Sequence, residues 1–344
     1  MKVKNKRSKH TLDNPKYYIN PRLSWLEFNS RVLSEAADKN SFALERLKFL
    51  AIATSNLEEF FMIRVSAVKK HRDMGQPNPT PDLLKPEVEL KKIRERVKKL
   101  LKRQYFLFYK KTIPLLLKNG IEIIFNQNAL LKYKTFLTEF FENEIKPILT
   151  PISVGLTHPF PNLVTGRLYL AVGLKPKDDN LAILEKSGLS FIEIPRNIQG
   201  RFVRIENKNV FAPLENIVKM FVHDIYKGYD VESANIIKIT RDADFTIDED
   251  EVLDFLKEIE TTIKQMHKRS ITKFEYEAGL PAKILNTLLE KNQLRKNDVY
   301  QINGMLNLND LIELYAKIDR SDLKDSQLPP ICDDSFTDDD IFED

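Results

Sequence analysis

The chain has 344 residues, of which 42% are apolar and 30% charged, a composition typical of a globular protein with more than one domain. Cys332 is the only cysteine, which excludes a disulfide framework and zinc sites built from several cysteines. The sequence shows neither a long apolar run nor a signal-peptide pattern, so we expect a cytoplasmic protein.

The formal net charge of +4 is small, but charge is unevenly distributed along the chain. Lysine and arginine are frequent from Lys85 to Lys118, whereas Asp333–Asp344 contains many acids and no basic residue. The basic segment indicates either a solvated helix face or contact with a polyanion, meaning nucleic acid, nucleotide or polyphosphate. Residues 1–14 predict a disordered basic arm, and residues 329–344 predict an extended linker.

The first helix is predicted from a capping pattern near its start. Ser24 and Glu27 have the spacing of a capping box, in which the serine accepts from a backbone amide and the glutamate reaches back. Leu23 and Phe28 are spaced for the hydrophobic staple that accompanies such a box. We therefore expect the helix to begin at Ser24.

Two further helical stretches are predicted, from about Leu44 to Lys70 and from about Pro86 to Leu117. Asn56, followed by a glutamate three residues later, predicts a helix cap and hence a break or kink in the first of these stretches. Glycine and proline predict a loop at residues 75–81. Together these helices define a helical N-terminal domain over residues 15–118.

The pattern changes after Asn119–Gly120, a pair typical of a helix stop. Short apolar runs then predict strands at residues 121–125, 167–174, 189–194, 201–205, 234–240, 273–277 and 299–302. Helices are predicted at residues 129–145, 214–225, 248–267, 282–291 and 308–315. Because strands and helices do not alternate strictly, we expect an α+β fold, with a mixed head domain over residues 119–328.

Standard catalytic motifs are absent from the sequence. No glycine-rich segment has the spacing of a Walker-type phosphate loop. The histidines form no His-x-Lys triplet and no metal-binding pair; they are His10, His71, His158, His223 and His267. The sequence therefore predicts no catalytic residue and no metal site within this chain.

Two polar clusters remain as candidate anion sites. In the first, Asn56 can donate and accept hydrogen bonds, and Arg64 can grip phosphate oxygens with two N–H groups. The alternative is that Asn56 only caps a helix. The second cluster, Thr240–Asp244, follows an apolar strand and either holds a metal, orients an arginine or forms a turn before the next helix. The first cluster also contains Glu58, Glu59, Lys69 and Lys70.

Two other features favour structural roles. His158 lies in a rigid proline-rich turn, His158–Pro161, and is interpreted as structural. In the basic run Lys91–Arg103, aromatic residues do not interleave with the cations as base stacking needs, so we expect no nucleic-acid partner.

Several blocks of the sequence resemble the polyphosphate kinases. They occur in that family's order and cover nearly the whole chain: Tyr17–Asn29, Arg31–Ala36, Glu45–Leu50, Ser55–Phe60, Thr157–Pro161 and Ile239–Asp244. The resemblance implies a helical N-terminal domain and a head domain, which in this family precede two further C-terminal domains.

The resemblance also implies an activity. The family reversibly transfers the terminal phosphate of ATP to polyphosphate through a phosphohistidine, which lies in a His-x-Lys motif of the third domain. Since that motif is absent here, we expect this chain alone to lack turnover, and we expect the Mg²⁺ that accompanies ATP to be held by the other domains. The alternative is a non-catalytic module that binds polyphosphate or nucleotide, or dimerises, and so regulates a complete kinase.

Only one binding role carries over directly. Asn56 of the block Ser55–Phe60 is the residue that the resemblance places in the ATP pocket, and Arg64 is a second candidate. The implied partners are ATP, ADP, inorganic polyphosphate and a second copy of the chain, bound through the head domain. Peripheral contact with the inner membrane is a further expectation.

Overall fold

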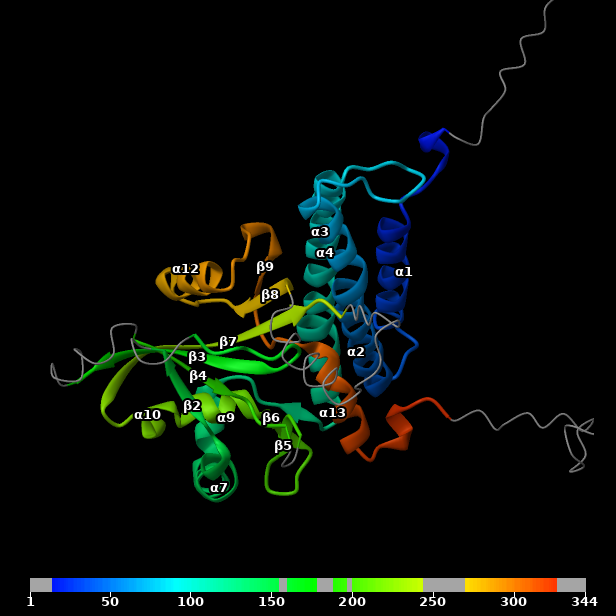
Figure 1. Ribbon diagram of the computed structural model, residues 1–344. Helices are drawn as coiled ribbons and strands as arrows, with labels where there is room; N and C mark the ends of the chain where they lie inside the picture. Colours follow the sequence, from blue (N-terminus) through cyan, green and yellow to red (C-terminus); the bar gives the residue numbers. More distant parts are fainter. Residues whose placement is uncertain (1–13, 155–159, 178–187, 197–199, 244–269, 327–344) are drawn as a thin grey trace, which may run out of the picture.

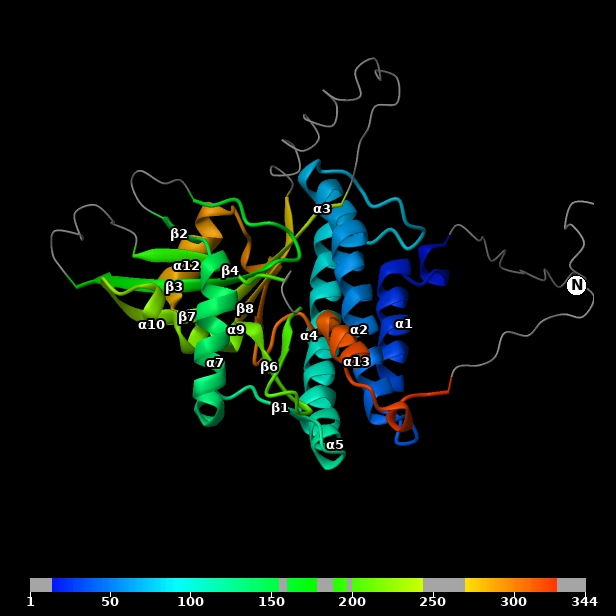
Figure 2. The same cartoon turned by 90° about the horizontal axis from the view of Figure 1, so that it is seen from below.

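The structure, a computed structural model, describes residues 14–154, 160–177, 188–196, 200–243 and 270–326 (Figure 1). A bundle of long helices lies beside a head built on a twisted sheet, and Figure 2 shows the two parts side by side from a second direction. The α+β fold class is thus confirmed. Three predicted segments lie outside the described residues: the basic arm except its last residue, the helix at 248–267 and the linker at 329–344.

The bundle consists of three long helical rods. Its helices are α1 (Pro21–Glu35), α2 (Ala43–Glu59), α3 (Ser66–Asp73), α4 (Pro86–Leu107) and α5 (Ile113–Lys118). One π-helical turn, η2 (Phe60–Val65), joins α2 to α3, and another, η3 (Phe108–Thr112), joins α4 to α5. The predicted loop at residues 75–81 lies between α3 and α4 and is confirmed.

The first helix begins at Pro21, so the predicted capping box at Ser24 and Glu27 is wrong. Asn20 is the cap: its side-chain oxygen accepts from the backbone N–H groups of Arg22 and of the next residue, each at 3.0 Å. Proline at the first helical position suits this start, because it has no N–H to satisfy. The staple is also absent, since Phe28 is 47% exposed.

The third rod, formed by α4, η3 and α5, ends where the sequence predicted. Asn119 and Gly120 close α5, and Gly120 has a left-handed backbone with a φ of 76°. The amide of Ile121 then bonds the carbonyl of Leu116 at 3.0 Å, a pattern that satisfies the last carbonyls of a helix.

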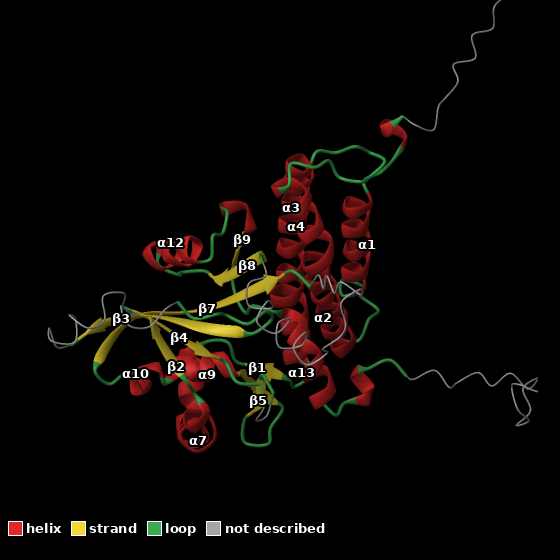
Figure 3. Cartoon of the chain, in the orientation of Figure 1, coloured by secondary structure: helices red, strands yellow, loops and turns green. Residues whose placement is uncertain are grey.

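The head is organised around a six-stranded sheet with the order β2-β4-β3-β7-β8-β9 (Figure 3). All neighbours are antiparallel except β8 and β9, which run parallel. The strands are β2 (Pro151–Val154), β3 (Leu168–Pro176), β4 (Leu189–Glu193), β7 (Tyr229–Arg241), β8 (Ile271–Glu277) and β9 (Val299–Ile302). A smaller sheet has the order β1-β6-β5, with β1 (Glu122–Ile123), β5 (Phe202–Arg204) and β6 (Val210–Pro213).

Both faces of the large sheet are covered. On β3, Leu168, Leu170 and Val172 belong to one apolar cluster, whereas Tyr169 and Ala171 belong to another. This alternation is expected because successive side chains of a strand point to opposite faces. One face packs on α7 (Lys134–Phe140), α9 (Leu214–Met220) and α10 (Val222–Ile225), and the other on α12 (Ala282–Lys291). The short α6 (Gln127–Leu130) precedes α7.

The last described α-helix, α13 (Leu311–Lys317), joins the head to the bundle. Leu311 and Leu314 are buried in the same apolar cluster as Leu47 and Leu50 of α2. The hydroxyl of Tyr315 donates to the buried carboxylate of Glu45 at 2.9 Å. The bundle and the C-terminal part of the head therefore share a hydrophobic core.

Candidate functional site

Helix α2 passes through Asn56 without a break, so the predicted cap and kink at this residue are wrong. The physical reason is that Leu57 and Phe60 continue the buried stripe of the helix. The hydroxyl of Thr54 is satisfied within the helix, because it donates to the carbonyl of Leu50 at 2.9 Å. The helix widens only after Glu59, in η2.

Asn56 contacts the neighbouring helix through a second asparagine. Its Nδ2 donates to Oδ1 of Asn29 at 3.2 Å, and Nδ2 of Asn29 donates to the carbonyl of Ala53 at 3.0 Å. Asn29 is fully buried, whereas Asn56 is half-buried. Within the part of the chain that the structure describes, the side-chain oxygen of Asn56 has no hydrogen-bond partner, so it is available to a ligand.

Arg64, the second candidate, lies against an aromatic stack. Its guanidinium is 5.2 Å from the ring centroid of Trp25, and Trp25 is stacked on Phe60 with centroids 4.7 Å apart. Such a cation–π contact orients the guanidinium without neutralising it. No ion pair to Arg64 exists among the described residues.

The structure brings the two candidates to the same side of the helix pair α1/α2. Asn56 contacts Asn29 and Arg64 contacts Trp25, and these two partners are four residues apart on α1. Side chains with this spacing lie one above the other on a helix face. We call the group formed by Trp25, Asn56 and Arg64, together with the buried Asn29 beneath it, the α1/α2 face; Arg64 belongs to η2, which continues α2.

Glu58, two residues after Asn56, belongs to a different environment. Its carboxylate forms an ion pair with Lys238 at 2.8 Å, accepts a hydrogen bond from Thr240 at 2.8 Å and also pairs with Lys273. Lys238 and Lys273 are almost completely buried, with side chains 2% and 1% exposed, and Glu275 lies 3.1 Å from Lys273. We call these five residues of α2, β7 and β8 the buried joint.

Charges in the buried joint shift one another's protonation. Burial raises the pKa of Glu58, but Lys238 and Lys273 outweigh it and hold that pKa well below its ordinary value. Burial lowers the pKa of Lys273, but Glu275 and Glu58 outweigh it and raise the pKa above the ordinary value for lysine. Glu58 and Lys273 therefore both carry charge at neutral pH and attract each other, and their pairing connects α2 of the bundle to β8 of the head.

The two lysines of the first cluster bind groups of the head, whereas Glu59 is exposed. Lys69 is buried, donates to the carbonyls of Ile271 and Thr272 at 3.1 and 3.0 Å, and pairs with Asp298 at 2.8 Å. Lys70 pairs with Asp242 at 3.0 Å. These two lysines connect the bundle to the head, and only Asn56 and Arg64 stay as binding candidates.

The second cluster also links the domains. Thr240 belongs to the buried joint, Asp242 pairs with Lys70, and the amide of Ala243 donates to the carbonyl of Met62 at 3.1 Å. The predicted turn and the helix at 248 lie outside the described residues, which exclude 244–269. His158 lies outside them as well.

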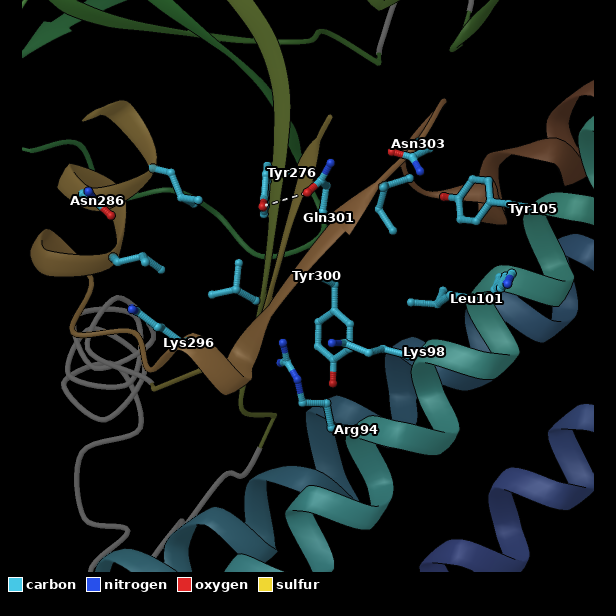
Figure 4. A pocket seen from close by; sticks show the side chains of 15 residues that line it. Arg94, Lys98, Leu101, Tyr105, Tyr276, Asn286, Lys296, Tyr300, Gln301 and Asn303 are labelled. Atoms are coloured by element: carbon cyan, nitrogen blue, oxygen red, sulfur yellow. Dashed lines mark hydrogen bonds between the residues drawn. The ribbon is translucent and has the colours of Figure 1, made fainter. Parts of the chain in front are cut away.

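Sequence reasoning missed a cavity beside the basic run of α4. Within that run, Arg94, Lys98 and Lys102 line a cavity of about 760 Å³ that is bounded by β9 and α12 of the head (Figure 4). The same run also contains exposed lysines that do not line this cavity, namely Lys91, Lys92 and Lys99. The spacing of four residues between the three lining cations was the available signal, because it places them on one face of the helix.

The described residues contain no group of three His, Cys, Asp or Glu side chains that could hold a metal ion. No helix among the residues that the structure describes is long and apolar enough to cross a membrane.

Comparison with known proteins identifies both parts of the chain. The family model of the polyphosphate kinase N-terminal domain matches residues 18–124, and that of the polyphosphate kinase middle domain matches residues 132–314. A polyphosphate kinase of Halalkalibacterium halodurans is 37% identical over 317 residues, which are 91% of this chain and 44% of the relative. One from Thermosynechococcus vestitus is 33% identical, over 87% of this chain and 41% of the relative.

A solved structure agrees with these sequence matches. The crystal structure of polyphosphate kinase from Porphyromonas gingivalis matches with a TM-score of 0.71 and 27% identity, over 91% of this chain and 43% of that one. The chain thus spans less than half the length of the relatives that it matches. Because family models cover both its helical and its mixed part, the chain belongs to the polyphosphate kinase family.

Proposed function

We propose that this chain supplies the N-terminal and middle parts of a kinase that reversibly transfers the terminal phosphate of ATP to polyphosphate through a phosphohistidine. Family membership supports the phosphotransferase class. The observation that carries the proposal is the α1/α2 face, where Asn56 and Arg64 lie on one side of two packed helices. On this proposal the face forms part of an ATP pocket, and ADP leaves the same pocket after transfer.

Each residue of the α1/α2 face has a distinct task in this proposal. Arg64 binds phosphate oxygens, and its stacking on Trp25 limits the number of orientations that must be frozen on binding. Asn56 offers an amide oxygen and, by exchanging its bond to Asn29, an amide donor to the nucleotide. Neither group is a nucleophile, so these residues bind and orient ATP.

The head domain is proposed to form a homodimer. Support comes from β2, which is an edge strand of the six-stranded sheet and pairs only with β4 among the described residues. Ile148 and Ile152, just before and within this strand, are exposed. An edge strand with exposed apolar side chains is suited to pairing with another chain. Sedimentation equilibrium of the chain tests this part, and a monomer at all concentrations contradicts it.

The ATP assignment is tested with Asn56→Asp. The substitution removes the amide donors and places a carboxylate near phosphate, and a lost hydrogen bond to a charged group costs about 1.5–3 kcal/mol. We expect calorimetry to show ATP affinity reduced by at least about tenfold. Asn128→Asp, the same change at an exposed position of α6, is the matched control. Equal ATP affinity in both variants and the wild type would refute the ATP role of Asn56.

A further inference from the structure

The cavity between α4 and the head has walls of two different kinds (Figure 4). Arg94, Lys98 and Lys102 come from α4, and Lys296 comes from the segment just before β9. The opposite wall is formed by α12 and β9 and is largely apolar. Its apolar lining residues are Leu285, Leu289, Val299 and Ile302, with Leu101 added from α4.

The charged side chains that line this cavity are all positive. Four cationic side chains line it, and no aspartate or glutamate is among its lining residues in the described part of the chain. Lys98, Lys102 and Lys296 form no ion pair with any described residue, and Arg94 bonds only the carbonyl of Asn297 while stacking on Tyr300 at 5.2 Å. Such a cluster of like charges attracts an anion with several charges.

The apolar wall indicates that the anion also carries an apolar or aromatic group. Tyr276 presents its ring to the cavity, whereas the Tyr300 ring is buried beneath Arg94. Asn286 and Gln301 present amide groups beside the aliphatic side chains. The hydroxyl of Tyr276 already donates to Gln301 at 3.3 Å, which holds that amide in place. A bare phosphate chain would leave the Tyr276 ring and the partly exposed aliphatic groups of Leu285, Leu289 and Val299 in contact with water, whereas a ring system with polar edges would cover them.

The volume of the cavity is consistent with a ligand that has both a multiply charged anionic group and a ring system. The cavity of about 760 Å³ lies within the usual range for small-molecule sites, roughly 300–1,000 Å³. We propose that this cavity binds a nucleoside di- or triphosphate, with its phosphates on the cations of α4 and its base against α12 and β9. This site is separate from the α1/α2 face, because α4 contacts α1 through Arg96 and Arg103 and meets the cavity through other residues.

The position of the cavity gives such a ligand a structural consequence. Its phosphates contact the helical bundle and its base contacts the head, so bound nucleotide bridges the two domains. Because a ligand stabilises the state that it binds, the nucleotide raises the stability of the joined arrangement. The proposed function does not require this site, and the site does not require the proposed function.

The test is calorimetric titration of the chain with ADP, in the wild type and in the double variant Lys98→Glu/Lys102→Glu. We expect the variant to lose about tenfold or more in ADP affinity at this site, because two phosphate contacts become repulsive. The matched control is Lys92→Glu/Lys99→Glu, which makes the same change of net charge at exposed positions of α4 outside the cavity. An equal loss in the control would overturn the proposal, since it would show a general effect of charge.

Two further measurements distinguish recognition of the phosphates from recognition of the base. Asn286→Leu is expected to weaken ADP several-fold and to leave tripolyphosphate binding unchanged. Tripolyphosphate that binds the wild type as tightly as ADP would overturn the assignment to a nucleotide. ADP binding that is abolished by Asn56→Asp but unaffected by both cavity variants would also overturn it, while leaving the proposed ATP role of the α1/α2 face intact.

Discussion

Lysines gather at two places on the boundary between the bundle and the head, and the two places differ in how charge is balanced. In the buried joint, Lys238 and Lys273 are almost inaccessible to water and share Glu58 and Glu275. In the cavity beside α4, Lys98, Lys102 and Lys296 are exposed and have no carboxylate partner among the described residues. The same residue type therefore lies in opposite electrostatic environments in neighbouring parts of the molecule.

The difference separates charges that the fold requires from charges that it does not require. A buried cation without a partner is strongly destabilising, so the lysines of the joint depend on their glutamates. An exposed cation loses little hydration on folding and needs no partner, so the cavity lysines stay free to bind a ligand. The comparison predicts large effects on stability in the joint and small ones in the cavity.

The largest effect is expected from Glu58→Ala. The change leaves Lys238 and Lys273 buried with Glu275 as their only carboxylate, and breaking a buried ion pair on one side costs about 3–5 kcal/mol. Urea denaturation measures the loss in free energy of unfolding. Glu59→Ala, at the adjacent exposed position, is the control and should change stability by less than about 0.5 kcal/mol. Similar values for the two variants would mean that the joint does not hold the domains together.

Acid should weaken the buried joint progressively. The pKa of Glu58 is held below its ordinary value of 4.5 in the folded chain, so the unfolded chain takes up this proton first. The contribution of Glu58 is therefore complete above about pH 4.5 and is lost as the pH falls toward the depressed pKa, at up to about 1.4 kcal/mol per pH unit.

Glu58→Gln removes this titration and tests its assignment. We expect the free energy of unfolding of the variant to fall less steeply with acid than that of the wild type, between about pH 5 and pH 3. Urea denaturation over this pH range gives both slopes. Parallel slopes would assign the acid sensitivity to other carboxylates.

A smaller effect is expected at the start of α1, where a polar group is buried but uncharged. Asn20 caps the helix and also donates to Asp82 and Glu89, each at 3.0 Å. Asn20→Ala should cost about 2 kcal/mol of stability, because a cap and two bonds to carboxylates are lost. Ser24→Ala, at the exposed fourth residue of α1 that the sequence favoured as the cap, should be nearly neutral in the same denaturation experiment. The reverse ranking would place the cap at Ser24.

Asn20 and Ser24 also show how far the sequence alone can be followed. Local patterns predicted that a helix exists here, but two capping patterns overlapped, and the contacts of Asn20 to Asp82 and Glu89 lie far along the chain. Short strands were missed for a related reason. β2 begins with Pro151 and β6 ends with Pro213, and proline lowers the expectation of a strand.

The candidate sites, too, could be predicted only where their residues lie close together in the sequence. The sequence placed Asn56 and Arg64 in one polar cluster, and in the structure both lie on the α1/α2 face. It could not show that Glu58 meets Lys238 and Lys273, because these residues are separated by about 180 positions or more and no local spacing relates them. For the cavity, the four-residue spacing of the cations indicates one basic face of α4, but no local pattern indicates the apolar wall opposite it.

The smallest effect on stability is expected from Lys98→Gln in the cavity. Four like charges line the same space, so removing one relieves repulsion instead of breaking an ion pair. Between exposed charges several ångströms apart this repulsion is below about 1 kcal/mol, and it is screened within a Debye length of about 10 Å at moderate salt.

We therefore expect Lys98→Gln to be unchanged in free energy of unfolding or stabilised by up to about 0.5 kcal/mol at low salt, with the gain vanishing at high salt. Lys238→Gln is the opposing control, because it removes a buried charge that pairs with Glu58. Its loss in free energy of unfolding should be several-fold larger than the gain of Lys98→Gln and should depend little on salt. A loss above about 1 kcal/mol in Lys98→Gln would show that this lysine has a stabilising partner. The cavity cations would then belong to the fold, as those of the joint do, and would not be free for a ligand.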